Sequence, residues 1–216
     1  MILRCIGHAE FLIELENGMR IVTDPYDHTC GYPVMKLAAD AVLVSHGHHD
    51  HSAVENVTGA QHIIDTAGVF DLGEGVKVIA VQADHDEAGG VKRGKTLLFC
   101  LEAEGLRVMH MGDLGHVPTN EQLAALGKAD VLMIPVGGFF TIDAAAAVQV
   151  AELLEARVVL PMHYKTSANA DWPIAGVESY TQLCHEPVEF VDLLRVAKGD
   201  LSCQPGAAVL KPQSLR

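Results

Sequence analysis

A cluster of metal-binding residue types constrains the fold of this chain more than any other feature. The apolar residues 41–44 lead directly into the letters SHGHHDH, in which His46, His48, Asp50 and His51 form an H-x-H-x-D-H pattern. Residues 41–44 have the composition of a buried strand. Three imidazoles and one carboxylate are a ligand set that suits zinc, manganese or iron(II). The pattern therefore predicts a metal site at the end of a strand.

Three later apolar runs also end at a residue that can bind a metal. His85 follows the run 76–81, Asp113 follows 106–109 and His163 follows 157–160. A single histidine or aspartate after a strand is most often a surface or hydrogen-bonded residue. Four strand ends of this kind in one chain are far more specific, and they indicate that these residues share one site.

The apolar runs also predict the fold class. Short runs bounded by Gly, Asn, Asp and Pro dominate the first half and predict strands, whereas strands alternate with helices in the second half. The longest predicted helix is 142–156, capped by Thr141 or Asp143, and shorter ones are predicted at 121–126 and 177–184. This order favours an α/β (α+β) fold with two packed sheets, helices outside, and one domain of residues 1–216. The predicted strands are 2–6, 11–15, 20–23, 41–45, 76–81, 96–101, 106–111, 130–135, 157–161, 188–191 and 209–210.

Composition limits the partners and the compartment. The 28 acidic residues outnumber the 15 Lys and Arg, giving a net charge of −13, and the sequence has no basic run. This balance argues against a nucleic-acid partner and favours a small-molecule substrate. No signal peptide or membrane span is visible, and the five cysteines are scattered. We therefore expect a cytoplasmic protein without disulfides, and a homo-oligomer is left open.

The series of metal-binding residues resembles the metallo-β-lactamase superfamily, whose fold is a four-layer αββα sandwich. The resemblance covers nearly the whole chain. Further motifs are similar to a branch of small, single-domain, metal-dependent hydrolases that includes ascorbate-6-phosphate lactonase. These motifs are Gly7-His8, Asp24-Pro25, Pro135-Val136-Gly137-Gly138 and Pro161-Met162-His163-Tyr164.

The resemblance implies a centre with two divalent metal ions, commonly zinc and in some members manganese or iron. In such a centre a bridging hydroxide attacks a lactone, amide or phosphoester bond of a small substrate, which can be anionic, and Asp50 or a metal-bound water handles the proton. The seven donors supply three ligands to each ion and one shared carboxylate. The implied ligands are His46, His48 and His85 for the first ion, Asp50, His51 and His163 for the second, and Asp113 as the bridge.

For some residues near these donors, the sequence allows more than one role. Asp24 ends the run 20–23, and the resemblance implies that it braces the histidine loop, with a simple Asp-Pro turn as the alternative. His8 is a candidate catalytic residue, as substrate contact or proton donor, or else a structural histidine. Strand alternation sets His110 on the face opposite Met109 and Met111, which favours a buried role behind the metal ligands.

The expected substrate contacts lie in two segments after strands. Gly137 and Gly138 could let the backbone approach a substrate closely, and Lys165 could bind a phosphate or carboxylate, although a solvated lysine is the default. Trp172 could cover the pocket or simply pack in the interior. Asp86, directly after His85, is expected to be solvated.

Three other functions remain open from the sequence. A phosphodiesterase or nuclease acting on nucleotides would use the same ions. A di-iron oxidoreductase is disfavoured because His48 stands where such members carry Glu, and because the chain leaves no room for a flavin domain. A non-catalytic metal-binding protein is disfavoured because all seven donors are present.

Overall fold

The six-stranded sheet begins as an antiparallel meander and continues in parallel. The computed structural model describes residues 1–215. In sheet order, β1 pairs with β15 on one side and with β2 on the other, and β3, β5 and β7 follow as parallel neighbours. The strands are β1 (Ile2–Gly7), β2 (Glu10–Glu14), β3 (Arg20–Thr23), β5 (Ala41–Leu43), β7 (His62–Ile64) and β15 (Leu194–Arg195).

The eight-stranded sheet has an antiparallel half and a parallel half. Strands β8 to β11 pair as consecutive hairpins, after which β12, β13, β16 and β14 run parallel to β11. The strands are β8 (Gly68–Gly73), β9 (Val76–Asp84), β10 (Lys95–Ala103), β11 (Leu106–His110), β12 (Val131–Pro135), β13 (Val158–Met162), β14 (Val188–Val191) and β16 (Ala207–Leu210).

The main core lies between the two sheets, and its composition follows from strand alternation. On β12, Val131 and Met133 belong to the core between the sheets, whereas Leu132 and Ile134 belong to the core under the helices. A strand buried on both faces needs apolar residues at every position. This is why the central strands were visible as continuous apolar runs in the sequence.

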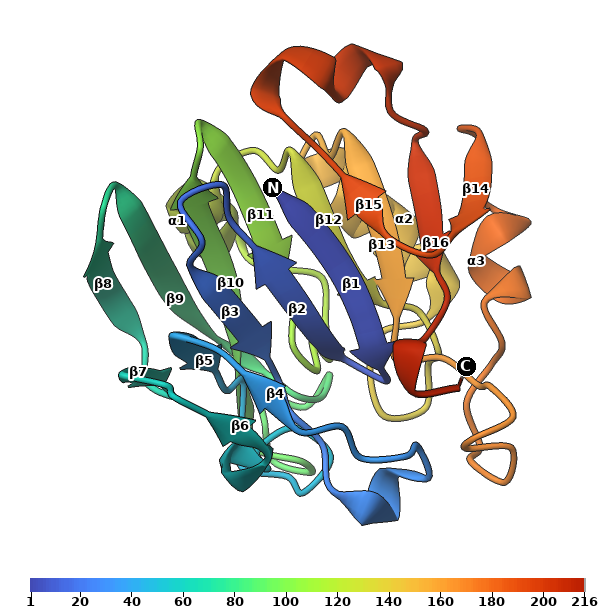
Figure 1. Cartoon of the computed structure of the whole chain (residues 1–216). Helices are drawn as coiled ribbons and strands as arrows, with labels where there is room; N and C mark the ends of the chain where they lie inside the picture. Colours follow the sequence, from blue (N-terminus) through green and yellow to red (C-terminus); the bar gives the residue numbers. More distant parts are fainter. Residues whose placement is uncertain (216) are drawn as a thin grey trace.

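The three α-helices among residues 1–215 all cover the eight-stranded sheet. The helices α1 (Asn120–Leu126), α2 (Ala144–Leu153) and α3 (Glu178–Thr181) lie against its outer face (Figure 1). The outer face of the six-stranded sheet is covered instead by the 3-10 turns η1 (His28–Cys30) and η2 (Val54–Asn56) and by the paired strands β4 (Leu37–Ala38) and β6 (Val57–Thr58). The predicted α/β class is confirmed. These short 3-10 turns and strands form the fourth layer of the sandwich, outside the six-stranded sheet.

Helices α2 and α3 are shorter than predicted, whereas α1 begins one residue earlier than predicted, and two short 3-10 turns lie near the end of the chain. Helix α2 begins after the N-cap Asp143, whose side chain accepts from the N–H of Ala146, and it ends at Leu153 rather than at residue 156. The 3-10 turns η3 (Lys198–Cys203) and η4 (Gln213–Leu215) were not predicted. Within residues 1–215, no helix is long and apolar enough to cross a membrane.

The strand directions bring distant residues to one end of the sandwich. Strands β1, β3 and β5 run parallel to one another, as do β9, β11 and β13. In Figure 1 the arrowheads of β1, β11 and β13 all point to the lower end of the molecule. The residues that follow these strands therefore meet at one edge, as expected for a site built from strand ends.

Candidate metal centre

The backbone turns sharply where several of these strands end. His8 after β1, Asp24 after β3 and His163 after β13 have φ angles of 54°, 40° and 52°, and Gly112 after β11 has 46°. Residues other than glycine rarely adopt positive φ, and such strained positions cluster at functional sites. Three of these four residues carry side chains that face the site described below.

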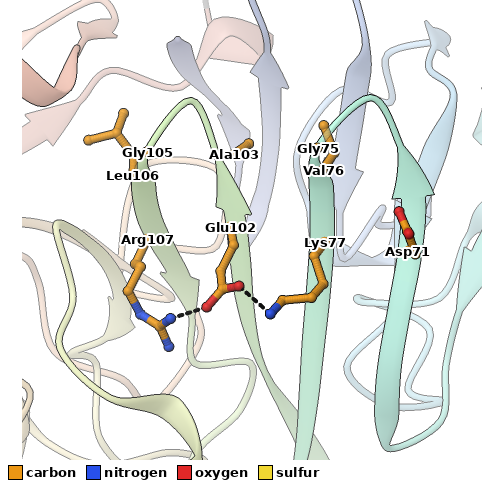
Figure 2. A pocket seen from close by; sticks show the side chains of 9 residues that line it. All are labelled: Asp71, Gly75, Val76, Lys77, Glu102, Ala103, Gly105, Leu106 and Arg107. Carbon is orange, nitrogen blue, oxygen red and sulfur yellow. Dashed lines mark hydrogen bonds and ion pairs between the residues drawn. The ribbon is translucent and has the colours of Figure 1, made fainter.

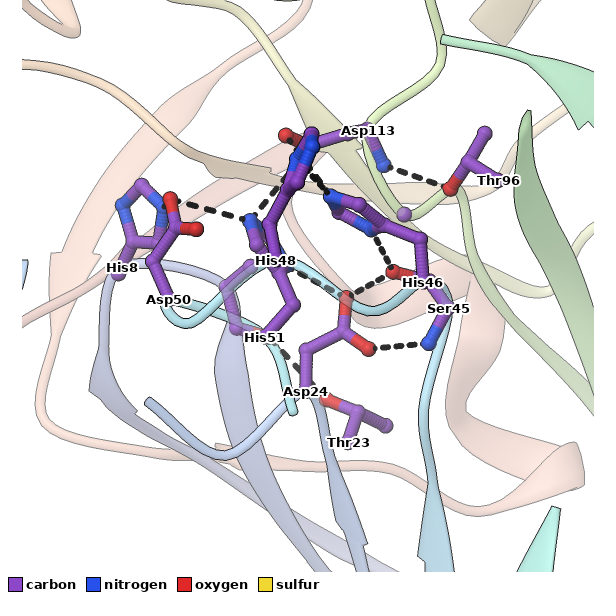
Figure 3. Close-up of polar contacts among 12 residues, drawn as sticks. His8, Thr23, Asp24, Ser45, His46, His48, Asp50, His51, Thr96 and Asp113 are labelled. Carbon is purple, nitrogen blue, oxygen red and sulfur yellow. Dashed lines mark hydrogen bonds and ion pairs between the residues drawn. The ribbon is translucent and has the colours of Figure 1, made fainter. Parts of the chain in front are cut away.

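The donors predicted from the sequence converge on the carboxylate of Asp113. Its oxygens lie 3.2 Å from Nε2 of His51 and 3.2 Å from Nε2 of His85. Nε2 of His163 is 3.4 Å away and Nε2 of His46 is 3.8 Å away. Asp113 is 2% exposed and its N–H donates to Oγ1 of Thr96 (Figure 3). A single buried carboxylate therefore stands among four imidazoles.

The donor atoms fall into overlapping groups, each compact enough to surround one ion. The members of each group have ligand atoms within 4.8 Å of one another. These groups are His46, His48 and His85; His8, Asp50, His51 and His163; and His46, His51 and Asp113. All seven predicted donors are thus brought together, and His8 is added to the group that contains Asp50.

Asp24 determines which ring nitrogen of His51 faces Asp113. Nδ1 of His51 lies 2.9 Å from Oδ2 of Asp24, and a carboxylate can only accept. Nδ1 therefore carries a proton in both states of the ring, and only the loss of the second proton leaves Nε2 with a lone pair towards Asp113. Both His51 Nε2 and Asp113 Oδ1 are buried without a hydrogen-bond partner among the described residues. Without a metal ion, a second proton on Nε2 of His51 lies between these two atoms, and an ion can take the place of that proton, so the donor set fits a metal ion.

The same carboxylate acts on His46 through Ser45. The Ser45 hydroxyl donates to Oδ2 of Asp24 at 2.6 Å, and its N–H donates to Oδ1 at 2.7 Å. The hydroxyl oxygen lies 2.9 Å from Nδ1 of His46, which must be the donor in this contact because the hydroxyl proton is already used. Nε2 of His46 is left as an acceptor and lies 2.9 Å from Nδ1 of His48. Figure 3 shows this chain of contacts.

The buried charges set the protonation states of the centre. Burial lowers the pKa of His51, but the carboxylates of Asp113 and Asp24 outweigh it and raise that pKa well above 6.5. Burial would raise the pKa of Asp113, but the charges of His163 and His51 hold it well below 3.8. Burial and the neighbouring His51 lower the pKa of His46 to about 3, and burial also lowers that of His85. His46 and His85 are therefore neutral near pH 7, which is the form that binds metals.

His110 lies behind the centre and takes no part in the donor groups. Its Nε2 donates to the carbonyl of Ala9 at 2.9 Å, and its Nδ1 accepts from the N–H of Gly112 at 3.2 Å. Both ring nitrogens are therefore satisfied, with Nδ1 4.0 Å from Oδ2 of Asp24. This position agrees with the predicted buried role.

His8 is buried next to Asp50 rather than exposed to a substrate. Its Nε2 lies 3.3 Å from Oδ2 of Asp50, and its ring centroid is 4.1 Å from that of His163. Burial and the neighbouring His163 lower its pKa to about 4. The histidine is 3% exposed and does not line the pocket at the centre. It can therefore orient Asp50 or join the metal ligands, but it does not contact a molecule in that pocket.

A pocket of about 340 Å³ opens onto the donors, which is within the usual size range for small-molecule sites. Trp172 is one of its walls, which matches one of the two roles considered for it. Neither Arg93 nor Phe140 was predicted to line the pocket. For Arg93, a single arginine in the loop letters VKRGK has no pattern that separates it from the lysines beside it. The pocket is lined by His48, His49, Asp50, His85, Arg93, Asp113, Phe140, His163 and Trp172.

The expected substrate contacts Lys165, Gly137 and Gly138 do not line this pocket. Lys165 has an exposed side chain, and its N–H donates to the carbonyl of Ala175. At Gly137, a Cβ atom would overlap the carbonyl oxygen of His163. The close approach that requires glycine there is to the backbone of His163, a candidate metal ligand, rather than to a substrate.

Asp86 is buried, contrary to the prediction that it is solvated. It is 1% exposed and accepts hydrogen bonds from the N–H groups of Ala88, Gly90, Lys92 and Arg93. Burial would raise its pKa, but these four donors prevail and lower it to about 2. An ionised Asp86 thus holds the loop that carries Arg93.

A second pocket, of about 490 Å³, lies at the opposite ends of β9 and β11 (Figure 2). Its charged groups neutralise one another, because Glu102 pairs with Lys77 at 2.5 Å and also with Arg107. Oδ1 of Asp71 accepts from the N–H of Gly73. None of the metal-donor groups lies here, so the pocket at Asp113 is the candidate functional site.

Comparisons with known proteins agree with the observed fold. A family model described as "Beta-lactamase superfamily domain" matches residues 3–163. A Thermococcus onnurineus protein named a UPF0173 metal-dependent hydrolase is 31% identical, with 88% of this chain and 95% of that protein covered. A crystal structure from Thermotoga maritima, described as a proposed Zn-dependent hydrolase of the metallo-β-lactamase superfamily, is 35% identical, with a TM-score of 0.77 and 97% of both chains covered.

A more distant structure shares the fold alone. Igni18, a metallo hydrolase from Ignicoccus hospitalis, is 23% identical, with a TM-score of 0.60 over 76% of this chain and 82% of that chain. The family match covers most of this chain, and the Thermotoga maritima structure matches it along nearly its whole length. The chain therefore belongs to the β-lactamase superfamily and has the metallo-β-lactamase fold.

Proposed function

We propose that this protein is a metal-dependent hydrolase that uses two divalent ions, most simply zinc, with manganese or iron as alternatives. His46, His48 and His85 would hold one ion, Asp50, His51 and His163 the other, and Asp113 would bridge them. The observation that carries the proposal is the buried carboxylate of Asp113 among four imidazole Nε2 atoms, of which those of His51 and His85 lie 3.2 Å away. The names of the relatives, metal-dependent hydrolase and Zn-dependent hydrolase, support the same reaction class.

When bound, two such ions would polarise the substrate and make water nucleophilic near neutral pH. The protein residues supply the geometry. Asp24 holds the proton on Nδ1 of His51, and through Ser45 it holds that on Nδ1 of His46, so that both Nε2 atoms face inward. Nε2 of His8 lies 3.3 Å from Asp50 and can orient its carboxylate, which reaches the pocket and can accept a proton there. His8 is thus a positioning residue in this proposal.

The proposed substrate is a small molecule with a lactone, amide or phosphoester bond. A pocket of about 340 Å³ accommodates a metabolite-sized molecule. The fold alone does not decide the bond type, since related folds host different reactions. A phosphodiester of nucleotide size remains the second candidate because the same ions would serve it.

The proposal is tested by metal content and hydrolysis together. The purified protein is stripped with a chelator, reloaded with zinc or manganese, and assayed on a panel of lactones and phosphodiesters. We expect two ions per chain by elemental analysis, and hydrolysis that disappears on stripping and returns on reloading. Asp113→Ala should abolish both, whereas Asp65→Ala, at an exposed carboxylate outside the centre, should change neither. Hydrolysis that survives metal removal would overturn the proposal.

A further inference from the structure

A guanidinium without a carboxylate partner stands in the wall of the metal pocket. Arg93 lines the pocket together with His85 and Asp113. Among the described residues, no carboxylate lies within ion-pair distance of it. Its charge instead faces two aromatic rings, with the guanidinium carbon 5.6 Å from the ring centre of Phe140 and 6.0 Å from that of Phe139. The rings restrict the guanidinium without neutralising it.

The loop that carries Arg93 is built to hold it in place. Oδ2 of Asp86 accepts from the N–H of Arg93 at 2.8 Å and from that of Lys92 at 2.9 Å, and Oδ1 accepts from two residues at the other side of the loop. Asp86 directly follows His85, so the anchor of the loop is adjacent in sequence to a metal-binding histidine. The position of Arg93 is therefore fixed relative to the donors, as expected for a recognition residue.

The walls around Arg93 describe the molecule that the pocket takes. Trp172 and Phe140 provide an apolar surface, with ring centres 5.9 Å apart. On the other side, Asp50 and Asp113 would have their charges compensated once two divalent ions are bound. Arg93 would then be an uncompensated positive charge in a small, largely apolar pocket, where it attracts an anionic group more strongly than it would in water.

We propose that Arg93 forms an anion-binding subsite, so that the substrate carries a carboxylate, phosphate or similar oxyanion beside an apolar part that packs against Phe140 and Trp172. This inference rests on the proposed function, because it names the class of substrate for the same pocket. It assigns to Arg93 the role that the sequence suggested for Lys165. The relevant anion belongs to a small molecule because a pocket of about 340 Å³ encloses no more than that.

Binding can be measured without any turnover, because Trp172 is the only tryptophan of the chain and lines the pocket. Zinc-loaded and metal-stripped protein are titrated with 2-phenylethanesulfonate, whose sulfonate is a weak metal ligand, and with the uncharged methyl 2-phenylethyl sulfone. Tryptophan fluorescence reports the occupancy. We expect the zinc-loaded wild type to bind the sulfonate about tenfold more tightly than the sulfone, as one charge-assisted contact predicts.

Two variants of the same loop decide the role of Arg93. Arg93→Met keeps the apolar stem and should weaken sulfonate binding about tenfold while leaving sulfone binding unchanged. Lys92→Met removes the same charge from the neighbouring residue, whose side chain is exposed and pairs with Glu87, and should leave both affinities unchanged. The inference is overturned if Arg93→Met binds the sulfonate as tightly as the wild type, or if the wild type shows no preference for the sulfonate.

Failure of the subsite and failure of the hydrolase proposal have different signatures. If no lactone or phosphodiester is cleaved but the sulfonate preference depends on Arg93, the subsite stands and the hydrolase proposal falls. If metal-dependent hydrolysis is found but the preference is the same in Arg93→Met, only the subsite falls. If the metal-stripped wild type still prefers the sulfonate and metal-stripped Arg93→Met does not, the preference is due to Arg93 and not to the ions.

Discussion

The carboxylate of Asp24 lies 2.9 Å from Nδ1 of His51 and determines which nitrogen of that ring can bind a metal. The same carboxylate accepts both the hydroxyl and the N–H of Ser45, whose hydroxyl oxygen accepts in turn from His46. One buried side chain thus sets the proton positions of two histidines that are proposed to bind different ions. Asp24 contacts no donor atom that faces the pocket, so its effect is entirely through its neighbours.

Asp24→Asn is expected to weaken metal binding at both positions by roughly 10- to 100-fold. An amide offers one acceptor oxygen where the carboxylate offers two, so either the Ser45 N–H, or both the Ser45 hydroxyl and Nδ1 of His51, lose their acceptor and face an N–H group instead. A competition titration with a chromophoric chelator measures the change. Asp65→Asn is the control, because Asp65 is exposed and outside the centre. An unchanged metal affinity in Asp24→Asn would show that these proton positions do not matter for binding.

Metal binding should release about one proton per chain near pH 7, and affinity should rise with pH. The pKa of His51 is well above 6.5 in the metal-free protein, so the ring is protonated there and must lose its Nε2 proton to bind an ion. His46 and His85 have lowered pKa values and contribute no proton at this pH. Zinc titration calorimetry in two buffers with different ionisation enthalpies gives the number of protons released.

A control variant tests whether a neighbouring histidine is the source of that proton. His49 is exposed, lies in the same loop as His51 and belongs to none of the donor groups, so His49→Gln should release the same number of protons as the wild type. Metal binding without proton release near pH 7 would contradict the raised pKa of His51.

Gly137→Ala is expected to lower the stability of the protein and to displace a metal-binding histidine. The added Cβ would overlap the carbonyl oxygen of His163, and overpacking of this kind costs about 1 to 3 kcal/mol. We expect a lower Tm and weaker binding of one of the two ions. Gly199→Ala is the control, because no atom lies within 4 Å of the position of its Cβ. If Gly137→Ala has the Tm and metal content of the wild type, the close backbone contact is not required.

The convergence of the seven candidate donors could be predicted from the sequence because of a simple geometric rule. Each lies just after an apolar run, and the carboxyl ends of parallel strands meet at one edge of a sheet. The central strands were equally visible, since burial on both faces makes them apolar throughout. Strand β8 was not visible, because it pairs only with β9 at the edge of the sheet and leaves residues such as Val69 68% exposed.

Arg93 and Asp86 could not be predicted because loop structure depends on side chain to backbone contacts. Nothing in the letters DEAGGVKRGK shows that Asp86 turns inward to accept four backbone N–H groups. Without that contact, Arg93 has no defined place and looks like a solvated arginine. Similarly, Gly137 suggested an approach to a substrate, whereas its neighbour is the backbone of His163, which is far away in sequence.

Glu10→Gln is expected to stabilise the protein at neutral pH. Glu10 begins β2, is 2% exposed, and has one carboxyl oxygen without a hydrogen-bond partner. Burial raises its pKa well above 4.5, and the charge of Asp24 raises it further, whereas a hydrogen bond from the backbone of Tyr26 opposes the shift. Below pH 4.5 the carboxyl is protonated in both the folded and the unfolded chain. Above it the unfolded chain ionises freely, so the folded state loses stability as the pH rises towards the raised pKa.

The glutamine has the same shape and cannot ionise, so it removes this loss. The difference in Tm between Glu10→Gln and the wild type should therefore grow as the pH is raised from about 4.5 to neutral, measured by thermal unfolding of the metal-free proteins. Replacing this buried, partly unsatisfied carboxyl group should raise the free energy of unfolding by at least about 1 kcal/mol, which raises the Tm of a chain of this size by roughly 2 to 4 °C. Glu152→Gln, at an exposed position of α2, should give a Tm difference that does not change with pH. If the two variants behave alike, Glu10 is not held in its protonated form by the fold.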